Sequence, residues 1–128
     1  MRTYSTSEFE IRIKDGLLEM RSEGTRVSQT GSDGERAFNS LLRSESIEIA
    51  SFDIRSADFR FTSVELESRI RYIGRQCRGI PLAFIGRSDQ QDQVRAAVRA
   101  IEKMDGVARG FRSREKALAW LDTMRQPA

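Results

Sequence analysis

The chain has 128 residues, of which 38% are hydrophobic and 32% charged, a composition that fits one small globular domain. It contains one cysteine and no histidine. An intramolecular disulfide is therefore excluded, as are histidine-based catalytic triads and Cys/His zinc sites. Carboxylate, Lys, Tyr, Cys and Ser/Thr chemistry stays open, and we expect neither a metal ion nor another cofactor.

The net charge is only +3, and arginine supplies nearly all of the 22 basic residues. This small excess of positive charge does not by itself indicate a nucleic-acid-binding protein. The longest uninterrupted apolar stretch, residues 80–86, is far shorter than the roughly 18 residues of a membrane span. Residues 1–10 lack the apolar segment of a signal peptide. We expect a cytoplasmic protein that binds no nucleic acid and does not insert into a membrane.

The first predicted elements form a β-hairpin. Residues 9–13 alternate between apolar and polar side chains, which is the period of a half-buried strand. The pair Asp15-Gly16 is a strong turn signal, and a second apolar segment, residues 17–20, follows it.

A loop, a helix and a third strand come next. Residues 25–34 are rich in Ser, Thr and Gly and are predicted as a loop, with Ser32 or Asp33 as the N-cap of the following helix. That helix is expected to end near residues 43–46. The strand is predicted from four apolar residues, Ile47, Ile49, Phe52 and Ile54. The apolar residues change from odd to even positions between 49 and 52. This change indicates a bulge or a strand buried on both faces.

The rest of the chain alternates helices and strands. Residues 63–78 have helical apolar spacing, with Cys77 on the buried face, and the apolar run 81–85 predicts a central parallel strand. The next predicted elements are a helix that begins at Ser88 or Asp89 as its N-cap and reaches residue 104, a strand at 107–111, and a helix at 113–124 capped by Ser113.

The predicted fold is a single α/β domain over residues 1–128, with a core from about 8 to 124 and the element order ββαβαβαβα. Its sheet is expected to be mixed and mainly parallel with helices packed against it, because parallel strands are joined by helical crossovers. Ligands and partners usually meet such a sheet at the carboxyl ends of its parallel strands. A homodimer would use an exposed sheet edge or the first hairpin.

Two carboxylates flank the predicted end of the third strand, Asp53 and Asp58. A carboxylate pair can hold Mg²⁺ or work as acid and base, but this spacing supplies no further ligands, and Arg55 is at hand to pair with Asp53. We therefore predict interaction or loop roles for Asp53, Arg55, Asp58 and Arg60 and no catalytic residues. Acid–base chemistry by Asp53, Asp58 or Tyr72 is kept as a third, enzymatic hypothesis.

The densest basic cluster consists of Arg69, Arg71, Arg75, Arg78 and Arg87. These arginines do not share one narrow helical face with aromatic residues, so a platform for stacking nucleic-acid bases is missing. The cluster is interpreted as a solvated basic face, or else as a surface that docks an acidic protein.

Residues 52–66, FDIRSADFRFTSVEL, resemble the strand, loop and helix start of STAS domains. This fold is shared by anti-sigma-factor antagonists and the cytoplasmic tails of sulfate transporters. Residues 110–121 look like the last strand and helix of bacterial STAS-like small proteins of unknown function. In STAS domains a serine at the helix N-terminus is phosphorylated by a partner kinase. Thr62 and Ser63 stand at the matching positions, while Phe61 and Val64 replace the family's Asp and Gly.

The resemblance implies a non-enzymatic regulatory module that contacts a protein partner around residues 58–63, with Ser63 and Thr62 as candidate phosphate acceptors. A phosphate at a helix N-terminus would meet free backbone N–H groups, and Arg55 and Arg60 are near enough in sequence to pair with it. The simpler role for either hydroxyl is to cap the helix. The alternative function is a small-ligand or lipid-binding α/β domain, with a pocket at the same strand ends, as in lipid-transfer proteins of related fold.

Overall fold

A computed structural model describes residues 2–5, 9–26 and 32–125 of the chain. In chain order its elements are β1 (Arg2–Ser5), β2 (Phe9–Lys14), β3 (Leu17–Arg26), α1 (Ser32–Ser44), β4 (Ile49–Phe59), α2 (Ser63–Gln76), β5 (Leu82–Ile85), the 3-10 turn η1 (Ser88–Gln90), α3 (Gln91–Glu102), β6 (Ala108–Phe111) and α4 (Arg114–Thr123). They form the predicted α/β arrangement, with one additional strand at the beginning.

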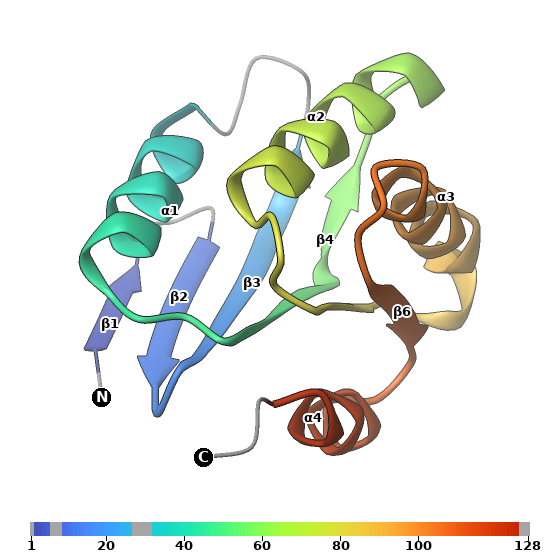
Figure 1. The fold of residues 1–128 in the computed structure, drawn as a ribbon. Coiled ribbons are helices and arrows are strands. Elements are labelled where there is room, and N and C mark those ends of the chain that lie inside the picture. The colour runs from blue at the N-terminus through green and yellow to red at the C-terminus, as the bar shows by residue number, and fades with distance from the viewer. Residues whose placement is uncertain (1, 6–8, 27–31, 126–128) are drawn as a thin grey trace.

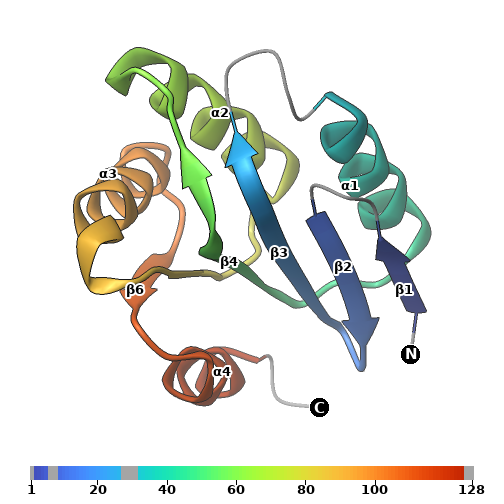
Figure 2. The ribbon, with the colours of Figure 1, turned by 180° about the vertical axis from the view of Figure 1, so that it is seen from behind.

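The six strands lie in the sheet in the same order as in the chain, β1-β2-β3-β4-β5-β6. The first three are antiparallel, and β3 to β6 are parallel. Figure 1 shows α1 and α2 in front of the sheet, and Figure 2 shows the strands from behind. α4 lies apart from the other helices and packs on the opposite face, against β4 and β5. The prediction of a mixed, mainly parallel sheet is confirmed.

The additional strand, β1, escaped prediction because its sequence, RTYS, lacks an alternating apolar face. All four side chains are exposed, and the strand forms by backbone pairing with β2, from Arg2 opposite Ile13 to Ser5 opposite Glu10. The β2–β3 hairpin is confirmed, with Asp15 and Gly16 both at positive φ in the turn. Because β1 covers β2, the hairpin does not form the edge of the sheet.

β3 and β4 are longer than predicted, and this changes the position of Asp58 relative to the strand end. They pair in parallel as far as Arg26 and Phe59, so Asp58 lies inside β4 and not beyond its end. The register shifts between Arg21 and Glu23, opposite Asp53 and Ser56, so this bulge lies beyond positions 49–52, where the apolar alternation changes. Residues 49–53 are all buried, so β4 is also covered on both faces at its start. Beyond residue 54 the strand is more exposed, and only Ala57 among residues 55–59 is buried.

Two apolar clusters hold the helices to the sheet. The larger cluster joins α1, α2 and α3 to one face, with the Phe52 ring between Phe38 and Phe84 at centroid distances of 5.6 and 5.4 Å. The smaller cluster joins α4 to the other face through Ala117 and Leu121. β4 and β5 contribute to both clusters, which explains the continuous apolar run that marks β5 in the sequence.

The prediction that Ser88 or Asp89 caps the third helix is wrong. Both residues lie in η1, and the N-cap of α3 is Gln90, whose side chain makes no capping bond. The Gln90 amide instead crosses to β4 and donates from Nε2 to the carbonyl oxygens of Ile54 and Ala57, at 2.9 Å each. Ser88 and Asp89 belong to a 3-10 turn that precedes α3. The local sequence does not distinguish this turn from the start of the helix.

The cap predicted for the last helix is confirmed, because the Ser113 hydroxyl accepts the Lys116 backbone N–H at 3.1 Å. The corresponding prediction for α1 concerns the side chains of Ser32 and Asp33, which lie outside the part of the chain that the structure describes.

Cys77 is buried as predicted, with 3% of its surface exposed, and burial raises the pKa of its thiol to about 12. We expect iodoacetamide at pH 8 to label Cys77 only when urea unfolds the protein. Because the folded-state pKa exceeds the unfolded value of 9.0, the thiol contributes stability that is complete below pH 9 and is lost as pH rises toward 12. Urea unfolding of the protein and of Cys77→Ala across that range checks the difference in slope. Equal labelling of folded and unfolded protein would contradict the burial.

Candidate functional site

The N-terminus of α2 is organised by Thr62. Its hydroxyl accepts the Glu65 backbone N–H at 3.1 Å, and the Glu65 carboxylate accepts the Thr62 backbone N–H at 2.9 Å. These two bonds form a complete capping box, which satisfies backbone donors that a helix start leaves open. Of the two candidate hydroxyls, Thr62 is therefore the N-cap.

Ser63 is the first residue of α2, and its side chain is exposed. The next residue, Val64, is also exposed, with 76% of its surface accessible. Backbone N–H groups in the first helical turn and the helix dipole favour negative charge at this position. A phosphate on Ser63 would lie there, whereas a phosphate on Thr62 would break the capping box.

Substitution of Thr62 by alanine is expected to lower the free energy of unfolding by about 1 kcal/mol, the usual cost of losing an N-cap. Ser63→Ala is expected to change it by less than about 0.5 kcal/mol, since an exposed residue is altered without loss of a cap. Urea unfolding followed by circular dichroism compares the two variants. Equal losses would show that the capping box does not stabilise the helix.

Asp53 and Arg55 form an ion pair on the α4 side of the sheet. Arg55 donates from Nη2 to Asp53 Oδ2 at 2.8 Å and from Nε to Oδ1 at 3.0 Å. The Arg55 backbone N–H also donates to Oδ1, at 3.0 Å. The bond to Asp53 raises the pKa of Arg55. Both residues line a surface hollow with Glu19 and Arg114, so the Arg55 side chain is directed away from α2 and Ser63.

Asp58 and Arg60 form a second pair, with Arg60 Nε 3.3 Å from Asp58 Oδ2. Both side chains are more than half exposed, so this pair adds little stability. It lies at the end of β4 and in the connection to α2. The four residues predicted for interaction are thus divided between the two faces, and only Asp58 and Arg60 stand beside the α2 N-terminus.

The residues of the enzymatic hypothesis are not brought together. Asp53 faces α4, whereas Tyr72 belongs to α2 on the other face of the sheet, where its hydroxyl accepts a hydrogen bond from the Asn39 amide. Among the described residues, no group of three or more Cys, Asp or Glu side chains could hold a metal ion. Within the same part of the chain, no helix has the length and apolar character needed to cross a membrane.

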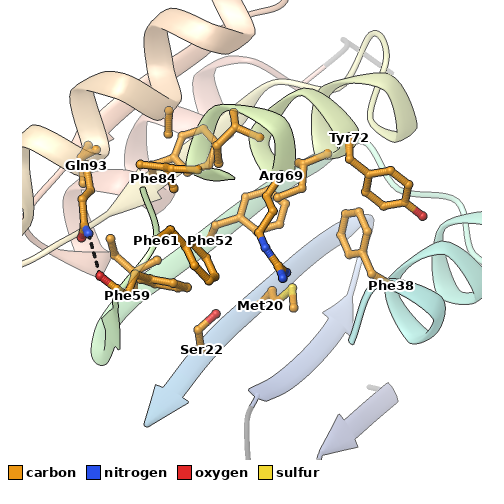
Figure 3. A pocket seen from close by; sticks show the side chains of 16 residues that line it. Met20, Ser22, Phe38, Phe52, Phe59, Phe61, Arg69, Tyr72, Phe84 and Gln93 are labelled. Carbon is orange, nitrogen blue, oxygen red and sulfur yellow. Dashed lines mark hydrogen bonds between the residues drawn. The ribbon is translucent and has the colours of Figure 1, made fainter. Parts of the chain in front are cut away.

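A pocket of about 120 Å³ lies between the sheet and the helices α1, α2 and α3 (Figure 3). Aromatic and aliphatic side chains make up most of its wall. The lining residues are Met20, Ser22, Phe38, Phe52, Ile54, Phe59, Phe61, Leu66, Arg69, Ile70, Tyr72, Ile73, Phe84, Gln93, Val94 and Ala97. They come from three strands, three helices and the connection before α2. The pocket therefore forms only when these elements pack together.

Few polar groups reach this pocket. Among the described residues, Arg69 is the only charged one in its lining, and its guanidinium lies 4.6 Å above the centre of the Phe61 ring. Figure 3 shows Arg69 extending from α2 toward Met20 on β3. The Gln93 side chain donates a hydrogen bond from Nε2 to the Phe59 carbonyl oxygen at 3.2 Å.

The sequence does not reveal which residues line this pocket. Its arginine pattern predicted Arg69 to belong to a basic face without aromatic partners, yet Phe61 lies directly beneath the guanidinium. Arg71 fits the prediction of a solvated basic face, because its side chain is exposed and pairs with Glu67. One usable signal was present: Arg69 borders the apolar helix face that includes Leu66, so its side chain can turn inward.

No protein-family model matches the chain, and no curated protein sequence matches it. Solved structures do resemble it. An uncharacterised protein with a SpoIIAA-like fold from Shewanella loihica PV-4 is 18% identical, with 94% of this chain and 99% of that chain covered and a TM-score of 0.65. An anti-sigma factor antagonist from Mycobacterium paratuberculosis is 14% identical over 89% of this chain and 92% of that chain, with a TM-score of 0.62.

A third structure, the anti-sigma factor antagonist SpoIIAA in its unphosphorylated form, is 9% identical over 89% of this chain and 97% of that chain, with a TM-score of 0.56. At these identities the similarity establishes the fold alone. The chain has the SpoIIAA-like fold, and the fold implied by the resemblance to STAS domains is confirmed.

Proposed function

We propose that this chain, which has the SpoIIAA-like fold, is a non-enzymatic regulatory module that binds a protein partner around the N-terminus of α2. Two solved proteins of the same fold are anti-sigma factor antagonists, which supports a regulatory role. The observation that carries the proposal is the exposed first turn of α2, where Ser63 stands at a helix start that is already capped by Thr62. Val64 adds an apolar contact beside it.

Phosphorylation of Ser63 is the proposed control. A phosphate adds about two negative charges, which the helix dipole and free backbone N–H groups of the first turn stabilise. The Thr62 hydroxyl is used by the cap, so Ser63 is the better acceptor. Arg60 is three residues away in the chain and exposed, and a phosphate would compete with Asp58 for it. The modification would place charge directly beside Val64 and so change the contact surface.

Peptide mapping of the protein from its native cells tests the modification. Trypsin cleaves after Arg60 and Arg69, so residues 61–69 form one peptide that holds Thr62, Ser63 and Ser68. Fragment ions that place phosphate on Ser63 would support the proposed control. Phosphate on Ser68 alone, or no phosphate under any growth condition, would remove it while leaving the contact surface to be tested separately.

Affinity capture with matched variants tests the contact surface. Ser63→Glu and Val64→Asp change the first turn of α2, and Val107→Asp changes another exposed valine just before β6. We expect one partner to bind the wild type and Val107→Asp equally, and Val64→Asp at least tenfold more weakly. A partner whose binding is the same for all four proteins would contradict the proposal.

The pocket under α2 supports a second candidate function, the binding of a small apolar ligand. A largely apolar cavity with a few polar groups is the usual form of a small-molecule site. Native mass spectrometry of the protein from its own cells is expected to show an added mass that disappears on denaturation. A mass equal to that of the bare chain, together with no binding of added apolar compounds, would count against this function.

A further inference from the structure

The C-terminal ends of α2 and α3 meet in the structure. The two helices lie side by side on the sheet (Figure 1) and come close together at Gly74. A Cβ atom at Gly74 would lie 3.0 Å from Cδ1 of Ile101 and 3.0 Å from Sδ of Met104. Gly74 lies in the last turn of α2, and Ile101 lies in the last turn of α3. Packing therefore joins two helix ends that are far apart in the sequence.

Four exposed cations flank this contact and form what we call the α2–α3 basic patch. Its members are Arg75, Arg78, Arg99 and Lys103. Those of α2 are spaced i,i+3 and those of α3 i,i+4, so each pair projects from one face. Each member is within four residues of Gly74 or Ile101, or about 6 Å along a helix axis. The patch is thus assembled from both helix ends.

The cations of the patch have no carboxylate partner. The neighbouring arginines differ in this respect, because Arg71 pairs with Glu67 and Arg95 pairs with Asp92. In the part of the chain that the structure describes, no salt bridge or side-chain hydrogen bond engages any member of the α2–α3 basic patch. Their N–H donors are therefore open to an external anion.

Nearby negative charge is too small to neutralise the patch. A helix C-terminus carries about half a negative charge, so the two helix ends contribute about one between them. Asp105, just after α3, adds one carboxylate. Glu102 comes one turn after Val98, which approaches Gly110 of β6, and so stands on the side of α3 away from α2. The patch keeps a net positive charge and attracts anions.

The composition of the patch favours carboxylates on a protein. Three of its four members are arginines, whose planar N–H forks bind carboxylates through two parallel hydrogen bonds. The exposed residues beside them on α2, Gln76 and Gly79, supply no apolar anchor, which stable attachment of a basic patch to a membrane requires. They also supply no aromatic ring on which nucleic-acid bases could stack.

We propose that the α2–α3 basic patch docks an acidic segment of a protein partner. Such a segment bridges the two helix ends, since each of them carries only two of the four cations. The proposal is independent of the contact at Ser63 and Val64, which lies at the other end of the 14-residue helix α2, about 20 Å away.

Fluorescence anisotropy with two labelled twelve-residue peptides tests the proposal on the whole protein. One peptide contains glutamate and alanine in equal number, and the other has glutamine in place of every glutamate. The glutamate peptide is expected to bind at least tenfold more tightly than the glutamine peptide. Its affinity should fall at least tenfold between about 25 and about 200 mM NaCl, because salt screens exposed charges.

Paired variants with an equal loss of charge assign the binding to the patch. Arg75→Gln with Lys103→Gln removes one cation from each helix end and is expected to weaken binding of the glutamate peptide at least tenfold. Each of these changes alone should weaken it as well, because the segment spans both ends. Lys14→Gln with Arg43→Gln removes two exposed cations from β2 and α1 and is expected to change the affinity less than threefold. Circular dichroism confirms that each variant is folded.

Three results would overturn the proposal. Equal losses in the two paired variants would show that the peptide responds to the overall charge and not to the patch. Failure of the wild type to bind the glutamate peptide at low salt would show that the patch holds no acidic segment. Tighter binding of phosphatidylserine vesicles or of a short DNA duplex, lost in Arg75→Gln with Lys103→Gln, would assign the patch to a membrane or to nucleic acid instead.

Discussion

Arg55→Met is expected to lower the free energy of unfolding by about 3 kcal/mol, whereas Asp53→Asn should cost only about 1 kcal/mol. The asymmetry follows from burial. The Asp53 side chain is 12% exposed and accepts three hydrogen bonds from the Arg55 guanidinium, while the Arg55 side chain is 37% exposed. Without Arg55 the carboxylate keeps a backbone N–H donor but loses its counter-charge. Without the carboxylate the guanidinium can be hydrated.

Urea unfolding of the two single variants and the double variant measures this coupling. The double variant, Arg55→Met with Asp53→Asn, is expected to be more stable than Arg55→Met alone, because no charge is then left buried without its partner. Arg60→Met, which removes an exposed arginine from a surface pair, serves as the control and should cost less than about 0.5 kcal/mol. Additive losses in the double variant would contradict the interpretation.

Gly110→Ala is expected to destabilise the protein by about 2 kcal/mol, because it overpacks the contact between β6 and α3. A Cβ atom at Gly110 would lie 2.5 Å from Cγ1 of Val94, and Val94 is 2% exposed. Gly86 approaches the other methyl group of the same valine, so Val94 is held between two glycines and has little room to move.

A second-site change tests this steric cause. Val94→Ala removes both methyl groups, so the double variant Gly110→Ala with Val94→Ala should cost at least about 1 kcal/mol less than the sum of the single variants. Arg109→Ala, an exposed change in the same strand, is the control and is expected to be nearly neutral. If the two losses simply add, Gly110 is required for a reason other than its contact with Val94.

The two proposed functions share one helix. α2 exposes Ser63 and Val64 at its start and covers the pocket with Arg69, Ile70 and Ile73 further along. A ligand in the pocket would therefore contact the same element that carries the proposed partner surface. Measuring partner binding with and without an apolar compound that binds the pocket is a direct way to detect coupling between them, because any effect of one on the other must be reciprocal.

Local chemistry allowed several site features to be predicted from the sequence. The cap at Thr62 and its partner Glu65 lie within one helical turn, and Asp53 and Arg55 are two residues apart. Such pairs form wherever the chain adopts the expected local conformation. The face of the sheet on which the pair lies was not predictable, because helices cover both faces and residues 49–53 are all buried.

Apolar periodicity by itself determined the order of elements from β2 to α4, since the spacing of buried residues differs between strands and helices. Only the tertiary structure decided where β1 pairs, because RTYS has no buried face. It likewise formed the pocket, by bringing Met20, Phe38, Phe61 and Arg69 together from separate elements. A cavity is space left between packed surfaces, so its position depends on how the sheet and three helices meet and not on the pattern within any one of them.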